Sequence, residues 1–171
     1  MSATKFEELQ KAVYEYGDAA FQNLLRCKAV ADAIIQEFPA YIGCTEDCVA
    51  AVPAEGAFDP RKDYGDEAFS FNQRDVIILE PVRFGLSLIV GNAEDAGSLF
   101  LRTVLSVEIV GDAYHVFVSG RPLVRVPIEF EGALGPVFDE IHNEFLETFT
   151  LEVMEFNDAR FKDGIGFLPI E

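Results

Sequence analysis

The chain has 171 residues, of which 13 are basic and 30 are acidic, so its formal net charge is −17. Such a charge argues against binding to nucleic acid or to an anionic membrane, and it favours solubility or a basic partner. Half of the residues are apolar and 16 are phenylalanine, so we expect a single folded domain over residues 1–171 with a substantial core.

The negative charge is concentrated near the C-terminus. Residues 131–171 contain 2 basic and 10 acidic side chains, a net charge of −8, which is nearly half of the total. Two interpretations are open. The charges form either the solvated face of a helix or a docking surface for a basic protein.

Sorting signals and cysteines indicate the compartment. The first twenty residues are charged and amphipathic and lack the apolar run of a secretory signal. No apolar run reaches the length of a transmembrane helix. The three cysteines, Cys27, Cys44 and Cys48, are an odd number at spacings that match no zinc or redox motif, as expected of reduced thiols. We therefore expect a cytoplasmic protein with no membrane contact.

Residues 1–39 are expected to form one long helix. Apolar side chains recur every three or four residues throughout this segment, which is the spacing of one helix face. Thr4 and Glu7 have the spacing of a capping box at its start. Gly17 marks a kink or a break, and Pro39 is expected to end the helix.

Residues 40–66 are rich in Gly, Pro and Asp and are expected to be an irregular loop. Residues 67–72 and 75–80 are candidates for two further strands, the second a buried run closed by Pro81. These two segments begin an antiparallel meander that is expected to extend over residues 67–130.

The strongest strand pattern starts at residue 82, where apolar and other side chains alternate with the period of a half-buried strand. Pairing Val90 with Leu99 keeps the apolar sides of the first two strands together. A two-residue hairpin at 111–112 then pairs Glu108 with His115.

The next connection, at residues 120–122, keeps the apolar side of the sheet continuous if it has three residues and Val118 lies opposite Val124. Pro127 cannot donate a hydrogen bond to a neighbouring strand, so the strand that contains it is expected to lie at a sheet edge.

Residues 133–157 resume a helical pattern with Pro136 in the first turn, although 149–153 also suit a strand. Residues 158–171 are expected to be an extended tail. The predicted fold class is α+β, with a long N-terminal helix and a C-terminal helix packed on a five- to six-stranded antiparallel β-meander. The surplus of large apolar residues also makes a homodimer a candidate, through the N-terminal helix or the last strand.

The predicted register places several polar side chains together on the face opposite the apolar one. These candidate ligand-binding residues are Arg83, Ser87, Arg102, Ser106, Glu108, His115 and Arg125. The three arginines suit a carboxylate or phosphate ligand, bound by forked hydrogen bonds. The same pattern is also typical of an ordinary solvent-facing sheet. Apolar residues on this face indicate a third possibility, that a helix, the 40–66 loop or another chain covers it.

Few residues suit catalysis or metal binding. Glu108 and His115 have the position of an acid–base pair, but such cross-strand pairs also simply stabilise sheets. Asp139 and His142 are spaced like half of a carboxylate–histidine metal site, and the chain has only one other histidine. We therefore expect no metal, no cofactor and no catalytic site.

The leading functional hypothesis is a non-enzymatic protein-interaction module, chaperone-like or regulatory, that binds a basic or amphipathic protein segment. It depends on the acidic C-terminal segment and on the lack of catalytic motifs. The alternative is a small-molecule or anionic-ligand domain with its site on the arginine-bearing sheet face. An enzyme that uses His115 and Glu108 is a third possibility.

Overall fold

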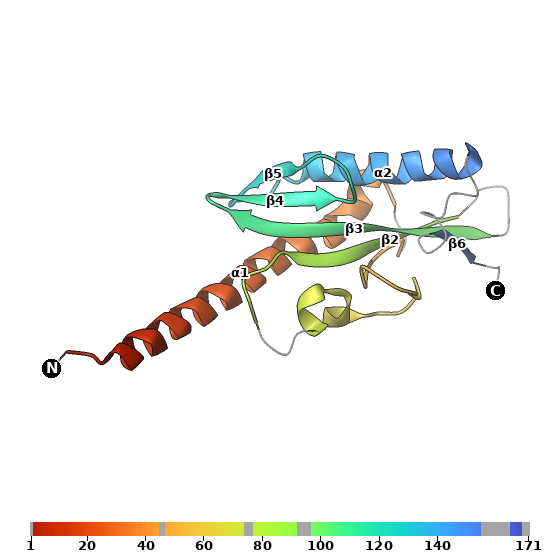
Figure 1. The fold of residues 1–171 in the computed structure, drawn as a ribbon. Helices are drawn as coiled ribbons and strands as arrows, with labels where there is room; N and C mark the ends of the chain where they lie inside the picture. The colour runs from red at the N-terminus through yellow and green to blue at the C-terminus, as the bar shows by residue number, and fades with distance from the viewer. Residues whose placement is uncertain (1, 45–46, 74–76, 92–96, 155–164, 169–171) are drawn as a thin grey trace.

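The computed structural model describes residues 2–44, 47–73, 77–91, 97–154 and 165–168. It contains a long helix α1 (Lys5–Ile42), six strands and a second long helix α2 (Gly135–Met154). The predicted α+β class is confirmed. Figure 1 shows α2 running along the sheet, while the N-terminal half of α1 projects beyond the rest of the molecule. None of the described helices has the length and apolar character needed to cross a bilayer.

Five strands form an antiparallel meander in which each strand pairs with the next along the chain. They are β1 (Val49–Val52), β2 (Val82–Gly91), β3 (Ser98–Val110), β4 (Ala113–Val118) and β5 (Val124–Pro127). A sixth strand, β6 (Ile165–Leu168), lies outside this path and pairs with the beginning of β3. As predicted from Pro127, β5 lies at an edge of the sheet.

The register between β2, β3 and β4 confirms most of the predicted pairings. Val90 lies opposite Leu99, and the two-residue turn at Gly111 and Asp112 places Glu108 opposite His115. The predicted pairing of Val118 with Val124 is wrong, because Val124 lies opposite Val116. The connection has five residues, and Ser119 has a positive φ of 51°. The shift of two residues leaves each side chain on its predicted face.

Helix α1 is continuous from Lys5 to Ile42, through Gly17 and past Pro39. The capping box at its start is confirmed, since Thr4 and Glu7 exchange backbone and side-chain hydrogen bonds. The prediction that Pro39 ends the helix is wrong. The helix ends at Gly43, which has a φ of 76° and caps the last turn by donating its N–H to Ala40.

The region between α1 and β2 departs most from the prediction. Residues 40–66 contain strand β1, whose four residues lie along β2. The predicted strand 67–72 is wrong, because 65–68 and 70–73 are 3₁₀ turns and only Phe69 makes a bridge to the sheet. Of the predicted strand 75–80, the described residues 77–80 are irregular, and residues 77–79 are exposed.

Both helices pack on the same apolar face of the sheet. Phe38 of α1 contacts Phe138 and Phe145 of α2, with ring centroids 5.8 and 6.4 Å apart. These rings belong to the same buried core as strand residues such as Phe84 and Leu105, which are fully buried. Residues 149–153 are helical, and positions 155–157 of the predicted helix lie outside the described residues. Within the predicted tail, residues 165–168 are strand β6, and 158–164 and 169–171 lie outside the described residues.

Candidate functional site

The sheet register places the seven predicted site residues on the face opposite the helices. Ser87 lies opposite Arg102, Arg83 lies opposite Ser106, and His115 lies between Glu108 and Arg125. The predicted pairings on β2, β3 and β4 are thus confirmed, whereas Arg125 lies on its predicted face but two residues from its predicted partner. The side chains do not converge on one point. They are spread over four strands, and the neighbours of each one differ.

Arg102 is bound by the chain segment that follows β1. Its Nη1 donates to the carbonyl oxygens of Pro53 at 2.8 Å and Gly56 at 2.9 Å. Its guanidinium lies over the ring of Phe58, with 4.6 Å between Cζ and the ring centroid. Phe58 in turn packs edge-on against Phe100 of β3. Part of the arginine-bearing face is therefore covered by residues 53–58, and Arg102 holds this cover in place.

Gly85 explains why the cover approaches the sheet so closely. A Cβ atom at this position would lie 2.8 Å from Cδ of Arg102 and 2.9 Å from the carbonyl oxygen of Pro53. Any larger residue would push both groups away. Ser87 is also closed off, since it is 1% exposed and its Oγ has no hydrogen-bond partner among the described residues.

The other two arginines form surface ion pairs. Arg83 is 3.1 Å from Glu55, and Arg125 is 2.8 Å from Asp112 in the preceding hairpin. Each of the three arginines therefore already has a partner within the chain. An anionic ligand on this face would have to displace these partners.

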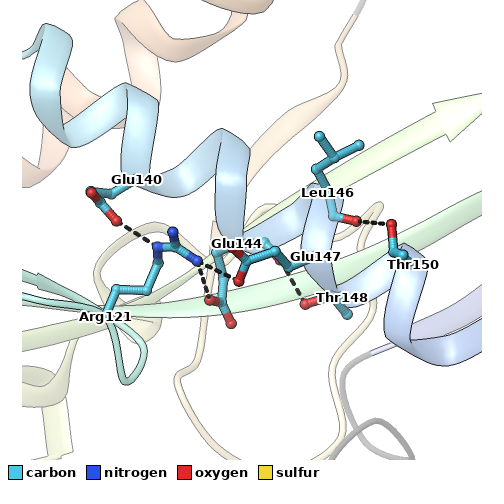
Figure 2. Close-up of polar contacts among 7 residues, drawn as sticks. All are labelled: Arg121, Glu140, Glu144, Leu146, Glu147, Thr148 and Thr150. Carbon is cyan, nitrogen blue, oxygen red and sulfur yellow. Dashed lines mark hydrogen bonds and ion pairs between the residues drawn. The ribbon is translucent and has the colours of Figure 1, made fainter. Parts of the chain in front are cut away.

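Helix α2 has an acidic stripe that is bound by a fourth arginine, which the sequence reasoning missed. Figure 2 shows Arg121, from the β4–β5 connection, between Glu140, Glu144 and Glu147. Its Nε is 2.5 Å from Glu140, and its Nη1 is 2.7 Å from Glu147 and 3.6 Å from Glu144. These hydrogen bonds raise the pKa of the guanidinium further, so Arg121 stays charged. Three carboxylates face one cation, and the stripe remains acidic.

The signal for this cluster was present in the sequence as the spacing of Glu140, Glu144 and Glu147. These positions lie on one side of a helix. The same stretch of α2 includes Thr148 and Thr150, whose hydroxyls donate to backbone carbonyls one turn earlier (Figure 2). The partner of the stripe was not visible because it comes from a loop 19 residues before Glu140.

A second candidate site is an apolar cleft where the C-terminal ends of α1 and β2 meet α2. Its volume is about 430 Å³. The lining residues are Phe38, Ile42, Gly43, Cys44, Cys48, Leu88, Ile89, Val90, Gly91, His142, Phe145, Leu146 and Phe149. At its rim, Val90 is 43% exposed and Leu146 is 56% exposed. The cleft is thus an opening into the core, between the apolar sheet face and α2.

Cys44 and Cys48 contribute a disulfide to the wall of this cleft. Their Cα atoms are 6.7 Å apart, and the pair joins the end of α1 to the residue before β1. The expectation of three reduced thiols is therefore wrong for these two. Gly43 ends the helix in a left-handed conformation directly before Cys44, and Cys48 follows four residues later. Cys27 is a free thiol buried in the core.

Asp139 and His142 have different surroundings, although the sequence suggested half of a metal site. Asp139 accepts a hydrogen bond from the hydroxyl of Tyr41 and thereby raises the pKa of that hydroxyl. His142 instead lines the apolar cleft. Within the described ranges, no three or more His, Cys, Asp or Glu side chains lie close enough to hold a metal ion.

No protein-family model, no curated protein and no solved structure matches this chain. The function is therefore inferred from the geometry of these sites alone.

Proposed function

We propose that the chain is a non-enzymatic protein-interaction module, chaperone-like or regulatory, that binds a basic or amphipathic protein segment in the apolar cleft. The observation that supports this proposal most directly is the open cleft lined by Phe38, Phe145 and Phe149 on a molecule of charge −17. Apolar side chains of the segment enter the cleft, and its basic side chains remain near the acidic surface.

Helix α2 supplies both kinds of contact. Leu146 lies at the rim of the cleft, and the next residue, Glu147, has a side chain that is 61% exposed. Glu147 belongs to the acidic stripe, whose three carboxylates are only partly neutralised by Arg121. A segment that crosses α2 therefore contacts the apolar rim of the cleft on one side of the helix and the acidic stripe on the other. An amphipathic helix with lysines beside its apolar face has the matching pattern.

A fluorescent peptide with leucine and lysine at helical spacing is a direct probe of this proposal. We expect the full chain to increase its fluorescence anisotropy at low salt and to bind more weakly as salt screens the charges. A peptide with glutamate in place of lysine should not bind. Leu146→Gln is expected to raise the dissociation constant roughly tenfold. This corresponds to about 1.4 kcal/mol, close to the free energy of burying one apolar side chain.

Leu123→Gln is the matched control, because Leu123 is a comparably exposed leucine in the β4–β5 connection and does not line the cleft. This variant should bind the peptide like the wild type. The proposal fails if the lysine peptide does not bind at low salt, or if the two leucine variants have the same effect.

A second candidate function is binding of a small apolar molecule in the same cleft. Its volume of about 430 Å³ lies within the usual range of small-molecule pockets. A neutral environment-sensitive dye that binds with little salt dependence and is not displaced by the lysine peptide would favour this candidate. The arginine-bearing face has less support as an anion site, because Arg83, Arg102 and Arg125 already have partners. A cytoplasmic location remains part of the proposal, and there the Cys44–Cys48 bond would be exposed to reduction.

A further inference from the structure

The N-terminal half of α1 has an apolar stripe that the rest of the chain leaves exposed. Phe6, Leu9 and Val13 are 67, 64 and 71% exposed, whereas Ala20 and Cys27 on the same stripe are fully buried. Figure 1 shows this part of α1 projecting away from the sheet. The stripe is thus the core-facing side of the helix, continued beyond the edge of the core.

The spacing of this stripe is that of a helix that packs against another helix. The residues recur at alternating steps of three and four, as Phe6, Leu9, Val13, Tyr16 and Ala20. The charged side chains of the same turns lie on the opposite side of the helix, as Glu7, Glu8, Lys11, Glu15 and Asp18. Two intrahelical ion pairs, Lys5–Glu8 and Lys11–Glu15, keep three of these side chains, and Lys5, bound along the helix surface.

The positions that flank the stripe contain no acidic residue. They are Lys5, Gln10, Ala12, Gly17 and Ala19. Gly17 is helical, and a Cβ atom added to it would meet nothing within 4 Å. A glycine inside a helix lowers helix stability relative to alanine. No contact among the described residues requires a glycine here, and its small size suits the close approach of a second helix.

We propose that two copies of this chain associate through these stripes as an antiparallel pair of α1 helices. The lack of carboxylates on this surface allows two copies to approach each other here despite their net charge. Two chains of charge −17 repel each other, but the stripe and its flanks contain no carboxylate. A symmetric pair also satisfies both stripes at once, because the same surface is used twice.

The segment at residues 77–79 favours the antiparallel orientation. The backbone N–H of Leu79 donates to the hydroxyl of Tyr16 at 3.1 Å, so this segment lies beside the inner end of the stripe. Ile77, Ile78 and Leu79 are 46, 40 and 50% exposed. In an antiparallel pair Leu9 meets Val13 of the second copy, and Phe6 reaches Tyr16 and the 77–79 segment of that copy.

The exposed apolar area approaches what a stable pair buries. A large apolar side chain offers about 150–200 Å² when free, so the stripe and residues 77–79 together expose on the order of 600 Å² per copy. Stable interfaces bury roughly 800 Å² per partner, and the flanking small residues supply much of the difference.

Sedimentation equilibrium of the full chain at micromolar concentration tests this proposal. The wild type is expected at twice the mass of the chain, and added salt should strengthen the pair by screening like charges. Val13→Glu should raise the dissociation constant at least about 100-fold, because the change enters the symmetric interface twice. Tyr14→Glu is the matched control. Tyr14 is 75% exposed, but it lies outside the stripe, on the charged side of the helix. This variant should therefore remain a dimer.

Val13→Glu both removes an apolar contact and adds negative charge. Leu9→Lys removes such a contact without adding negative charge, and it should also give a monomer. Circular dichroism should show that every variant stays folded, with a cooperative thermal transition. The midpoint should be lower for Val13→Glu and Leu9→Lys than for Tyr14→Glu, because a monomer lacks the stabilisation by association. A wild-type monomer overturns the proposal, as does a dimer that survives both stripe variants or one that salt weakens. A monomer whose stripe instead binds neutral lipid vesicles or the leucine–lysine peptide also overturns it. Peptide binding at the cleft should be unchanged by Val13→Glu, so this test is independent of the proposed function.

Discussion

Arg102 and Arg125 lie on the same sheet face, yet their replacement by methionine should affect stability very differently. Arg125 pairs with Asp112 at the surface, where the two side chains are 67 and 89% exposed. Such a pair contributes about 0–1 kcal/mol. Arg102 instead connects β3 to residues 53–58 through two carbonyl oxygens and the ring of Phe58.

The loss of stability expected for Arg102→Met can be estimated from these contacts. The bond to the partly buried Pro53 carbonyl is worth about 1.5–3 kcal/mol for a charged donor. Water replaces the donor at the exposed Gly56 carbonyl, so that bond adds little. The contact with Phe58 adds about 0.5–1 kcal/mol. Arg102→Met should therefore lower the free energy of unfolding by about 3 kcal/mol, and the melting temperature by roughly 6–12 °C.

Urea denaturation followed by circular dichroism measures both variants. Arg125→Met should lie within about 0.5 kcal/mol of the wild type. Limited proteolysis should also cut Arg102→Met faster within residues 53–58, because that segment loses its attachment to the sheet. Equal stability losses for the two variants, or an unchanged cleavage rate, would refute the assignment of Arg102 as the residue that holds this segment.

Three further measurements test the local geometry. Gly85→Ala should destabilise the protein by about 1–3 kcal/mol in urea, because its Cβ would lie 2.8 Å from Arg102, and a neutral outcome would contradict the close approach. Burial, with a smaller contribution from the charge of Glu108, raises the pKa of the Cys27 thiol to about 12, so iodoacetamide at neutral pH should label Cys27 only after unfolding. Hydrogen bonds from Thr4 lower the pKa of the Glu7 carboxylate, so its helix-capping contribution is present at neutral pH and is lost as the pH falls through that lowered value. NMR titration should show this shift, and a Glu7 pKa at its ordinary value would exclude the capping box in solution.

The sheet could be predicted from the sequence because strands have a side-chain period of two. Pairing Val90 with Leu99 and a two-residue turn at 111–112 together determine every pairing from β2 to β4. The side-chain period does not determine the next connection, since a shift of two residues keeps the same faces. The predicted face of Val124 is therefore correct, while its predicted partner is not.

The features that were missed depend on contacts between distant segments. β1 is only four residues long and has no alternation, so its strand conformation comes from pairing with β2. Residues 77–79 have the apolar run of a buried strand but lie exposed beside α1. The cleft is formed by the ends of elements far apart in the chain. Local patterns contain no information on such contacts.

Helix α1 separates the two proposed interaction surfaces. Its buried residues, from Ala20 to Phe38, are held in the core, while Val13 lies beyond one end of the core and Ile42 lines the cleft at the other. At about 1.5 Å per residue, these two residues are roughly 44 Å apart along the helix. An antiparallel pair formed at the N-terminal stripes would therefore place the two clefts at opposite ends of the dimer, open and far apart. A partner with two amphipathic segments on a long linker could occupy both clefts and bind more tightly than either segment alone.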